Sequence, residues 1–113
     1  MKSFYYALSG FMYALRTEYN LRIHVGSTVA VCIAGFLLHI STIEWLLVVA
    51  AVVAVVAAEL FNTAVEVLCN HVTPEFHPAI KQVKDVSAAA VLVISFGAAL
   101  TGAIIFIPKL FSL

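Results

Sequence analysis

Three stretches of this sequence are long and apolar enough to cross a lipid bilayer as helices. They run from about Ile23 to Ile40, from about Ile43 to Val72 and from about Val86 to Ile107. A bilayer with about 30 Å of hydrocarbon needs about 20 apolar residues at about 1.5 Å per residue. We therefore expect an all-α membrane protein, a single domain over residues 1–113, with three transmembrane helices.

The composition favours a membrane protein over a soluble domain. Of the 113 residues, 64% are hydrophobic and 11% are charged, whereas soluble domains average about 45–50% apolar and about 25% charged residues. A chain this small has a large surface for its volume, which so few polar groups could not cover in water. The formal net charge is zero, so nucleic acid binding has no electrostatic support.

Residues 2–21 have the pattern of an amphipathic helix on the membrane surface. Phe4, Leu8, Phe11 and Leu15 recur at helical spacing. All four tyrosines of the chain also lie in this segment, and aromatic side chains suit the headgroup level. An ordinary surface helix without chemistry is the alternative interpretation.

Short connections are expected between the spans. Residues 39–45 suggest a turn with Trp45 as an interfacial anchor. Residues 73–81 suggest a loop that contains Pro74 and Pro78. Pro108 is expected to end the third span, because proline interrupts helical hydrogen bonding.

Lysine and arginine positions predict the orientation. They stand before the first span and between the second and third, at Lys2, Arg16, Arg22, Lys81 and Lys84. The turn between the first and second spans has none, and the C-terminal tail has only Lys109. Because basic residues concentrate on the cytoplasmic side, we expect a cytoplasmic N-terminus and an external C-terminus.

A polar stripe runs along the second span. Glu59, Asn62, Glu66 and Asn70 are spaced at i, i+3, i+7 and i+11, which places them on one helix face. Glu59 should lie inside the cytoplasmic boundary of the bilayer. Inserting a charged carboxylate costs about 2.5–3.5 kcal/mol at the bilayer centre and less near the edge. An acidic residue kept at this depth therefore indicates function. The alternative is a polar pair that packs helices through the asparagines.

Further polar groups could meet this stripe at the cytoplasmic surface. They are Glu18, Asn20, Arg22 and His24 before the first span, Glu75 and His77 in the loop, and Lys84 and Asp85 near the third span. Alone, each suits a solvated interfacial position. Together they suit Mg²⁺, which takes oxygen ligands, and phosphates, whose charge a lysine offsets. Zinc is not expected, since no Cys/His spacing supports it.

These motifs resemble the prokaryotic diacylglycerol kinase family, which includes undecaprenol kinases. The strongest part is Glu59-Leu-Phe-Asn-Thr-Ala-Val-Glu66, followed by Glu75-Phe-His77 and by Lys84-Asp85-Val-Ser-Ala-Ala-Ala-Val-Leu92. The stretch Glu18-Tyr-Asn-Leu-Arg-Ile-His24 is also similar, and looks more like the undecaprenol kinase branch. The resemblance covers nearly the whole chain.

The resemblance implies a bacterial cytoplasmic (inner) membrane enzyme that phosphorylates a membrane lipid alcohol with ATP and Mg²⁺. It implies a homotrimer with active sites shared between subunits. It also implies a general base at Glu59, Mg²⁺-binding carboxylates at Glu18 and Glu66, and contacts with ATP from Tyr6, Glu18, Glu66, Glu75, His77, Lys84 and Asp85. Glu59 and Ala88 would border the lipid, while Asn62 and Asn70 would support the site. Asn70 departs from the Asp of many members, and Ala88 from the Ser of some.

Two other functions fit parts of the pattern. A proton- or ion-carrying membrane subunit could use the buried Glu59 alone, but it would not need the surplus of acids beside Lys84. A catalytically silent scaffold is the third interpretation. No Walker loop or kinase glycine-rich loop is present, so phosphate binding in a kinase of this sequence must come from side chains and metal.

Overall fold

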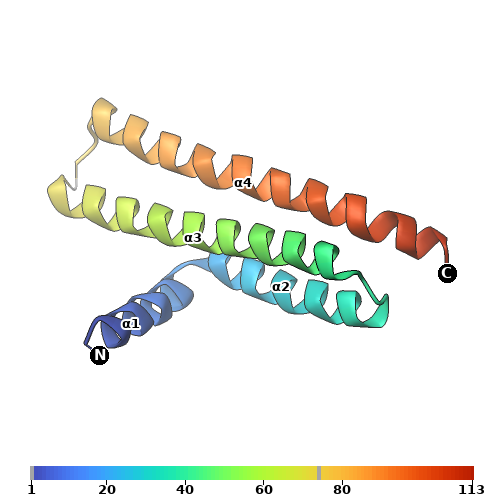
Figure 1. Ribbon diagram of the computed structural model, residues 1–113. Coiled ribbons are helices and arrows are strands. Elements are labelled where there is room, and N and C mark those ends of the chain that lie inside the picture. Colours follow the sequence, from blue (N-terminus) through green and yellow to red (C-terminus); the bar gives the residue numbers. More distant parts are fainter. Residues whose placement is uncertain (1, 74) are drawn as a thin grey trace.

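The chain folds entirely into α-helices and connecting turns over residues 2–73 and 75–113, the part that the computed structural model describes (Figure 1). The elements are α1 (Lys2–Thr17), α2 (Tyr19–Leu37), α3 (Thr42–Val72) and α4 (Pro78–Phe111). Helices α2, α3 and α4 are each long and apolar enough to cross a membrane. The prediction of an all-α protein with three candidate membrane-spanning helices is confirmed.

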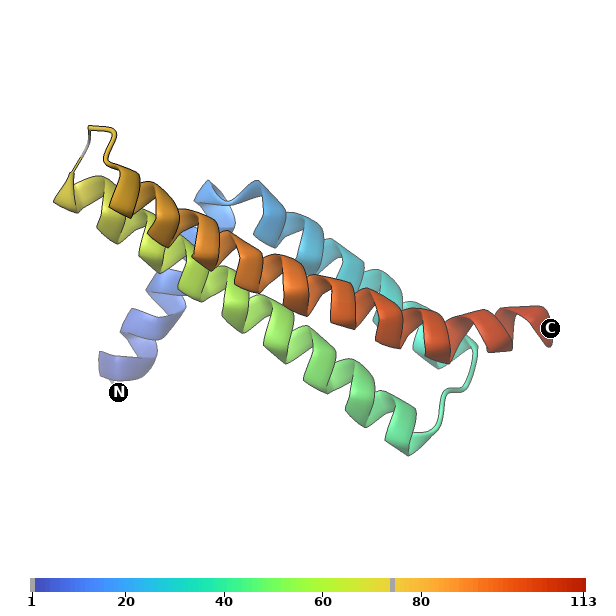
Figure 2. The ribbon, with the colours of Figure 1, turned by 90° about the horizontal axis from the view of Figure 1, so that it is seen from above.

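The three long helices form an elongated bundle, and α1 diverges from it. Helices α3 and α4 run side by side, with α2 against α3, and α1 turns away near the end where α3 and α4 are joined (Figures 1 and 2). The small apolar core is centred on Ile40, Val48 and Ile105. Most large apolar side chains face outward instead, as expected where lipid replaces water.

A break at Glu18 separates α1 from α2, so the helix predicted over residues 2–21 ends early. Glu18 has extended backbone angles, φ −110° and ψ 109°. The last carbonyls of a helix lack partners within it, and here Arg22 supplies them. Its Nη1 donates to the carbonyls of Leu15 at 2.9 Å and Arg16 at 3.0 Å. One basic side chain thus stabilises the end of α1 and the start of the first span.

The connection between α2 and α3 covers residues 38–41. Helix α2 ends at Leu37, earlier than the predicted Ile40, and α3 begins at Thr42, next to the predicted Ile43. Ser41 caps this helix. Its Oγ accepts from the backbone N of Glu44 at 3.2 Å, and Glu44 Oε1 accepts from the backbone N of Ser41 at 2.8 Å. This reciprocal pair is a capping box, which fixes where the helix starts.

Trp45 lies inside α3 and packs back onto α2. Its ring centroid is 4.9 Å from that of Phe36. A Cβ atom on the buried Gly35 would lie only 2.7 and 2.9 Å from atoms of the Trp45 ring. Only glycine therefore allows the two helices to approach this closely. The interfacial anchoring of Trp45 stays a prediction.

Helix α4 begins at Pro78, earlier than the span predicted from Val86. Proline suits the first turn of a helix, where its missing N–H would have no partner. His77 caps this end, because its Nδ1 accepts from the backbone N of Ala79 at 3.1 Å. Pro74, expected in the preceding loop, lies outside the described residues.

The prediction that Pro108 ends the third span is wrong. Helix α4 continues through Pro108 to Phe111. Proline removes one helical hydrogen bond, but the last turn has a tertiary contact that supports it. Lys109 Nζ lies 3.2 Å from Glu44 Oε1, which joins the end of α4 to the start of α3.

Candidate active site

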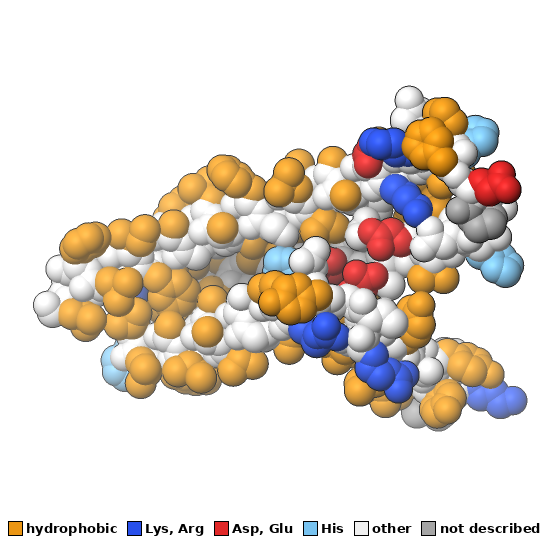
Figure 3. Space-filling model, turned by 180° about the vertical axis from the view of Figure 1, so that it is seen from behind, with side chains coloured by type: hydrophobic (Ala, Val, Ile, Leu, Met, Phe, Trp, Pro, Cys, Tyr) orange, Lys and Arg blue, Asp and Glu red, His pale blue; other side chains and the backbone are white. Residues whose placement is uncertain are grey.

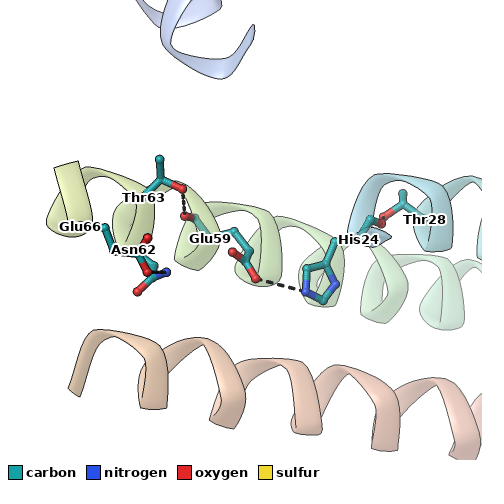
Figure 4. Close-up of polar contacts among 6 residues, drawn as sticks. All are labelled: His24, Thr28, Glu59, Asn62, Thr63 and Glu66. Carbon is teal, nitrogen blue, oxygen red and sulfur yellow. Dashed lines mark hydrogen bonds and ion pairs between the residues drawn. The ribbon is translucent and has the colours of Figure 1, made fainter. Parts of the chain in front are cut away.

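The most buried polar side chains of the described residues lie on one face of α3. Glu59 is 2% exposed, Thr63 5% and Asn62 9%. Thr63 Oγ1 donates to the backbone carbonyl of Glu59 at 2.9 Å (Figure 4). Glu59 and Asn62 of the predicted polar stripe therefore point into the protein, whereas Glu66 is half-buried and Asn70 is exposed.

Glu59 faces α2, where His24 points toward it (Figure 4). The distance from His24 Nε2 to Glu59 Oε1 is 3.3 Å. The pair lacks the alignment of a full hydrogen bond, and no other described group donates to this oxygen. His24 belongs to the Glu18–His24 motif, from which no role for it was predicted, because the helical spacing within α3 alone does not reveal a contact with α2.

Asn62 connects Glu66 with α4. Its Nδ2 donates to Glu66 Oε1 at 3.2 Å, and its Oδ1 accepts from Ser87 Oγ at 2.8 Å. Sequence reasoning overlooked Ser87, although Ser87 lies inside the Lys84–Leu92 motif. A polar residue one turn beyond Lys84 was the available signal.

Glu18 lies near both acids of α3. Burial raises the pKa of the Glu18 carboxyl above its ordinary value, and the negative charges of Glu66 and Glu59 raise it further. The charges of Glu66 and Glu59 therefore repel that of Glu18 in this structure. A bound cation would relieve that repulsion.

Lys84 reaches across from α4 to α3 and donates to Asn70 Oδ1. Its neighbour Asp85 pairs instead with Lys81, one turn earlier on the exposed surface of α4. Asn70 thus keeps the acceptor oxygen that an aspartate would offer, without the charge.

Four residues named from the sequence lie apart from this group. Tyr6 lines a groove between α1 and α3, together with Thr63 and other residues. Glu75 and His77 are exposed before α4, and Ala88 is exposed on α4. The structure describes no contact that brings these four to Glu59.

Most charged side chains gather at one end of the molecule (Figure 3), whereas Glu44 and Lys109 pair at the other. In the view of Figure 3, acidic and basic groups cover the end where α1 meets α2 and α3 joins α4, and hydrophobic side chains dominate the opposite half. Among the described residues, no three His, Cys, Asp or Glu side chains stand in an arrangement that could hold a metal ion by themselves. Any metal at this end would need further ligands.

Known proteins resemble the chain over nearly its full length. A family model described as prokaryotic diacylglycerol kinase matches residues 5–106. An undecaprenol kinase of Bacillus subtilis is 38% identical over 109 residues, covering 96% of this chain and 89% of the relative. A diacylglycerol kinase of Synechocystis is 38% identical over 112 residues, covering 98% of this chain and 64% of the relative. The chain therefore belongs to the prokaryotic diacylglycerol kinase family and is a lipid kinase, a phosphotransferase.

Proposed function

We propose that this protein transfers the γ-phosphoryl group of ATP to the hydroxyl of a membrane lipid alcohol, undecaprenol or diacylglycerol. The observation that carries the proposal is the gathering of Glu18, Glu59 and Glu66 at the charged end of an otherwise apolar bundle. A lipid alcohol holds its hydroxyl at headgroup level, and ATP approaches from water. This end is where the two can meet.

Glu59 acts as the general base. Its side chain is buried, and Glu59 precedes Glu66 on α3, nearer the apolar part of that helix. It takes the proton of the lipid hydroxyl as that oxygen attacks the γ-phosphorus. The bond from the γ-phosphorus to the bridging oxygen of ATP breaks, and ADP leaves.

Glu18 and Glu66 are the residues that would hold Mg²⁺. Mg²⁺ is commonly bound by one or two carboxylates together with substrate phosphates, so it needs no cluster of three protein ligands. The residues fit this ion, because both are carboxylates and the charge of Glu66 adds to burial in raising the pKa of Glu18. Mg²⁺ held there would supply positive charge to offset the negative charge of the transferring phosphoryl group.

The remaining contacts are assigned by position in the family motifs. Lys84 offsets phosphate charge, and its hydrogen bond to Asn70 keeps it at the α3–α4 interface. Other contacts with ATP come from Tyr6, Glu75, His77 and Asp85. Asn62 supports Glu66, and Ala88 borders the lipid.

The assembly and location follow the family pattern. The protein is a homotrimer in the bacterial inner membrane, with a cytoplasmic N-terminus and active sites shared between subunits. The separation of Tyr6, Glu75 and Ala88 from Glu59 within one chain is consistent with sites completed by a second subunit. Helix α1 lies on the membrane surface.

The deciding experiment compares two acceptors. Purified protein in lipid vesicles is given ATP and Mg²⁺ with undecaprenol or with diacylglycerol, and phosphorylated lipid is measured. Transfer to undecaprenol is expected to be faster, because the Glu18–His24 stretch resembles that branch. Absence of transfer to either alcohol would overturn the proposal.

Burial of Glu59 also favours a second candidate, a proton- or ion-carrying subunit. The two functions differ in their response to nucleotide. A kinase should gain thermal stability with Mg²⁺ and a non-hydrolysable ATP analogue, whereas an ion carrier should show no change.

A further inference from the structure

His24 has no part in the mechanism above, yet its ring is the one described donor group that approaches the carboxylate of Glu59. The two atoms are 3.3 Å apart, and Glu59 is 2% exposed. Leaving a buried polar group without a partner costs about 1–3 kcal/mol, and more for a charged group. A donor at this position therefore matters more than it would on the surface.

We infer that His24 is a positioning residue, whose Nε2 holds the Glu59 carboxylate in the orientation that receives the proton of the acceptor hydroxyl. This inference rests on the proposed function. The nearest polar side chain of the same stripe, Asn62, already binds Glu66 and Ser87. Orientation of Glu59 thus has to come from another helix, and α2 supplies it through His24 (Figure 4).

The surroundings of the ring suit this role. His24 lines a cavity of about 260 Å³ between α2, α3 and α4, with hydroxyl groups of Ser27, Thr28, Ser95 and Thr101. The described lining contains no second titratable side chain. Glu59 from α3 is therefore the acid that His24 faces, and α4 presents only hydroxyls and small or apolar groups there. The cavity also leaves room for a small molecule beside the ring.

Two substitutions separate positioning from packing. His24→Leu removes the donor and keeps most of the volume, whereas His24→Gln keeps an N–H donor. Misplacing a reacting group by about 1 Å can cost about 100-fold in rate, so His24→Leu should lower kcat about 100-fold. The KM for ATP and for the lipid should stay within about threefold, since neither contact is lost. His24→Gln should recover at least a tenth of the wild-type kcat.

Chemical rescue provides a second measurement. His24→Ala should lose kcat as His24→Leu does, and added imidazole should restore part of it by entering the space beside the cavity. Thiophene, a ring of similar size without an N–H donor, should not. Val48→Ala enlarges the same cavity away from Glu59 and serves as the control that imidazole should leave unchanged.

The outcomes distinguish this inference from the proposed function. Wild-type kcat in His24→Leu, or equal rescue by thiophene and imidazole, would overturn the positioning role while leaving lipid kinase activity intact. Equal loss of kcat in His24→Gln and His24→Leu, with unchanged melting temperatures, would do the same. A wild-type protein that phosphorylates neither alcohol would overturn the proposed function, and this inference with it.

Discussion

Ser87 of α4 donates a 2.8 Å hydrogen bond to the amide oxygen of Asn62 on α3. The nitrogen of the same amide donates to Glu66 at 3.2 Å. The Ser87 bond fixes which way the Asn62 amide faces, and the amide then orients a proposed metal ligand. The packing of α4 against α3 therefore influences how the Glu66 carboxylate is oriented.

Asn62→Leu should weaken the apparent affinity of the enzyme for magnesium. Partners of a metal ligand typically contribute about 10–100-fold to metal affinity or activity, so half-maximal rate should require about 10–100-fold more Mg²⁺. The measurement is the initial rate as a function of Mg²⁺. Ser87→Ala is the graded control, with a smaller shift because the Asn62–Glu66 bond remains. An unchanged magnesium curve in Asn62→Leu would mean that the amide does not orient Glu66.

Glu59→Gln should lower turnover by at least about 100-fold and leave the fold intact. General base catalysis contributes about 10²–10⁴-fold, and glutamine is close in shape but cannot accept the proton. The measurements are the amount of phosphorylated lipid and the binding of nucleotide. Nucleotide binding should persist in Glu59→Gln. Glu44→Gln is the matched control, since Glu44 caps α3 and pairs with Lys109 at the opposite end of the helix. It should retain activity, and undiminished turnover in Glu59→Gln would reject the base assignment.

The acids should make stability depend on pH when no divalent cation is present. Burial, Glu66 and Glu59 raise the pKa of Glu18 above the ordinary 4.5. The folded state therefore binds more protons than the unfolded state between 4.5 and the raised value, so stability falls as pH rises through that window. Melting temperatures measured across it should decline less in Glu18→Gln. An identical decline in both proteins would contradict the raised pKa of Glu18.

Gly35→Ala should destabilise the protein. The added Cβ would meet the Trp45 ring at 2.7 and 2.9 Å, and overpacking of this kind costs about 1–3 kcal/mol. Gly97→Ala is the control, because a Cβ there meets no described atom within 4 Å. Its melting temperature should be unchanged or higher, since alanine favours a helix over glycine by about 1 kcal/mol. The test is the difference between the two melting temperatures in one detergent.

Hydrophobic length and helical spacing were enough to predict the three candidate spans and the polar face of Glu59, Asn62 and Glu66. They could not predict the break at Glu18, because it depends on Arg22 folding back onto α1. The extension of α4 through Pro108 likewise depends on a tertiary contact.

Contacts between different helices could not be predicted from the sequence either. The pairing of Ser87 with Asn62 and of His24 with Glu59 crosses from one helix to another, whereas periodicity describes one helix at a time. The family motifs contained all four residues without indicating which of them touch.

The extended backbone of Glu18 has one more consequence. Glu66 belongs to the continuous helix α3, whereas Glu18 stands at a bend that hydrogen bonds hold in place. Its backbone N donates to the carbonyl of Ala14 at 2.8 Å, and its own carbonyl accepts from the backbone N of Arg22 at 3.4 Å. The spacing between Glu18 and Glu66 is therefore set by how α1 and α2 together pack against α3.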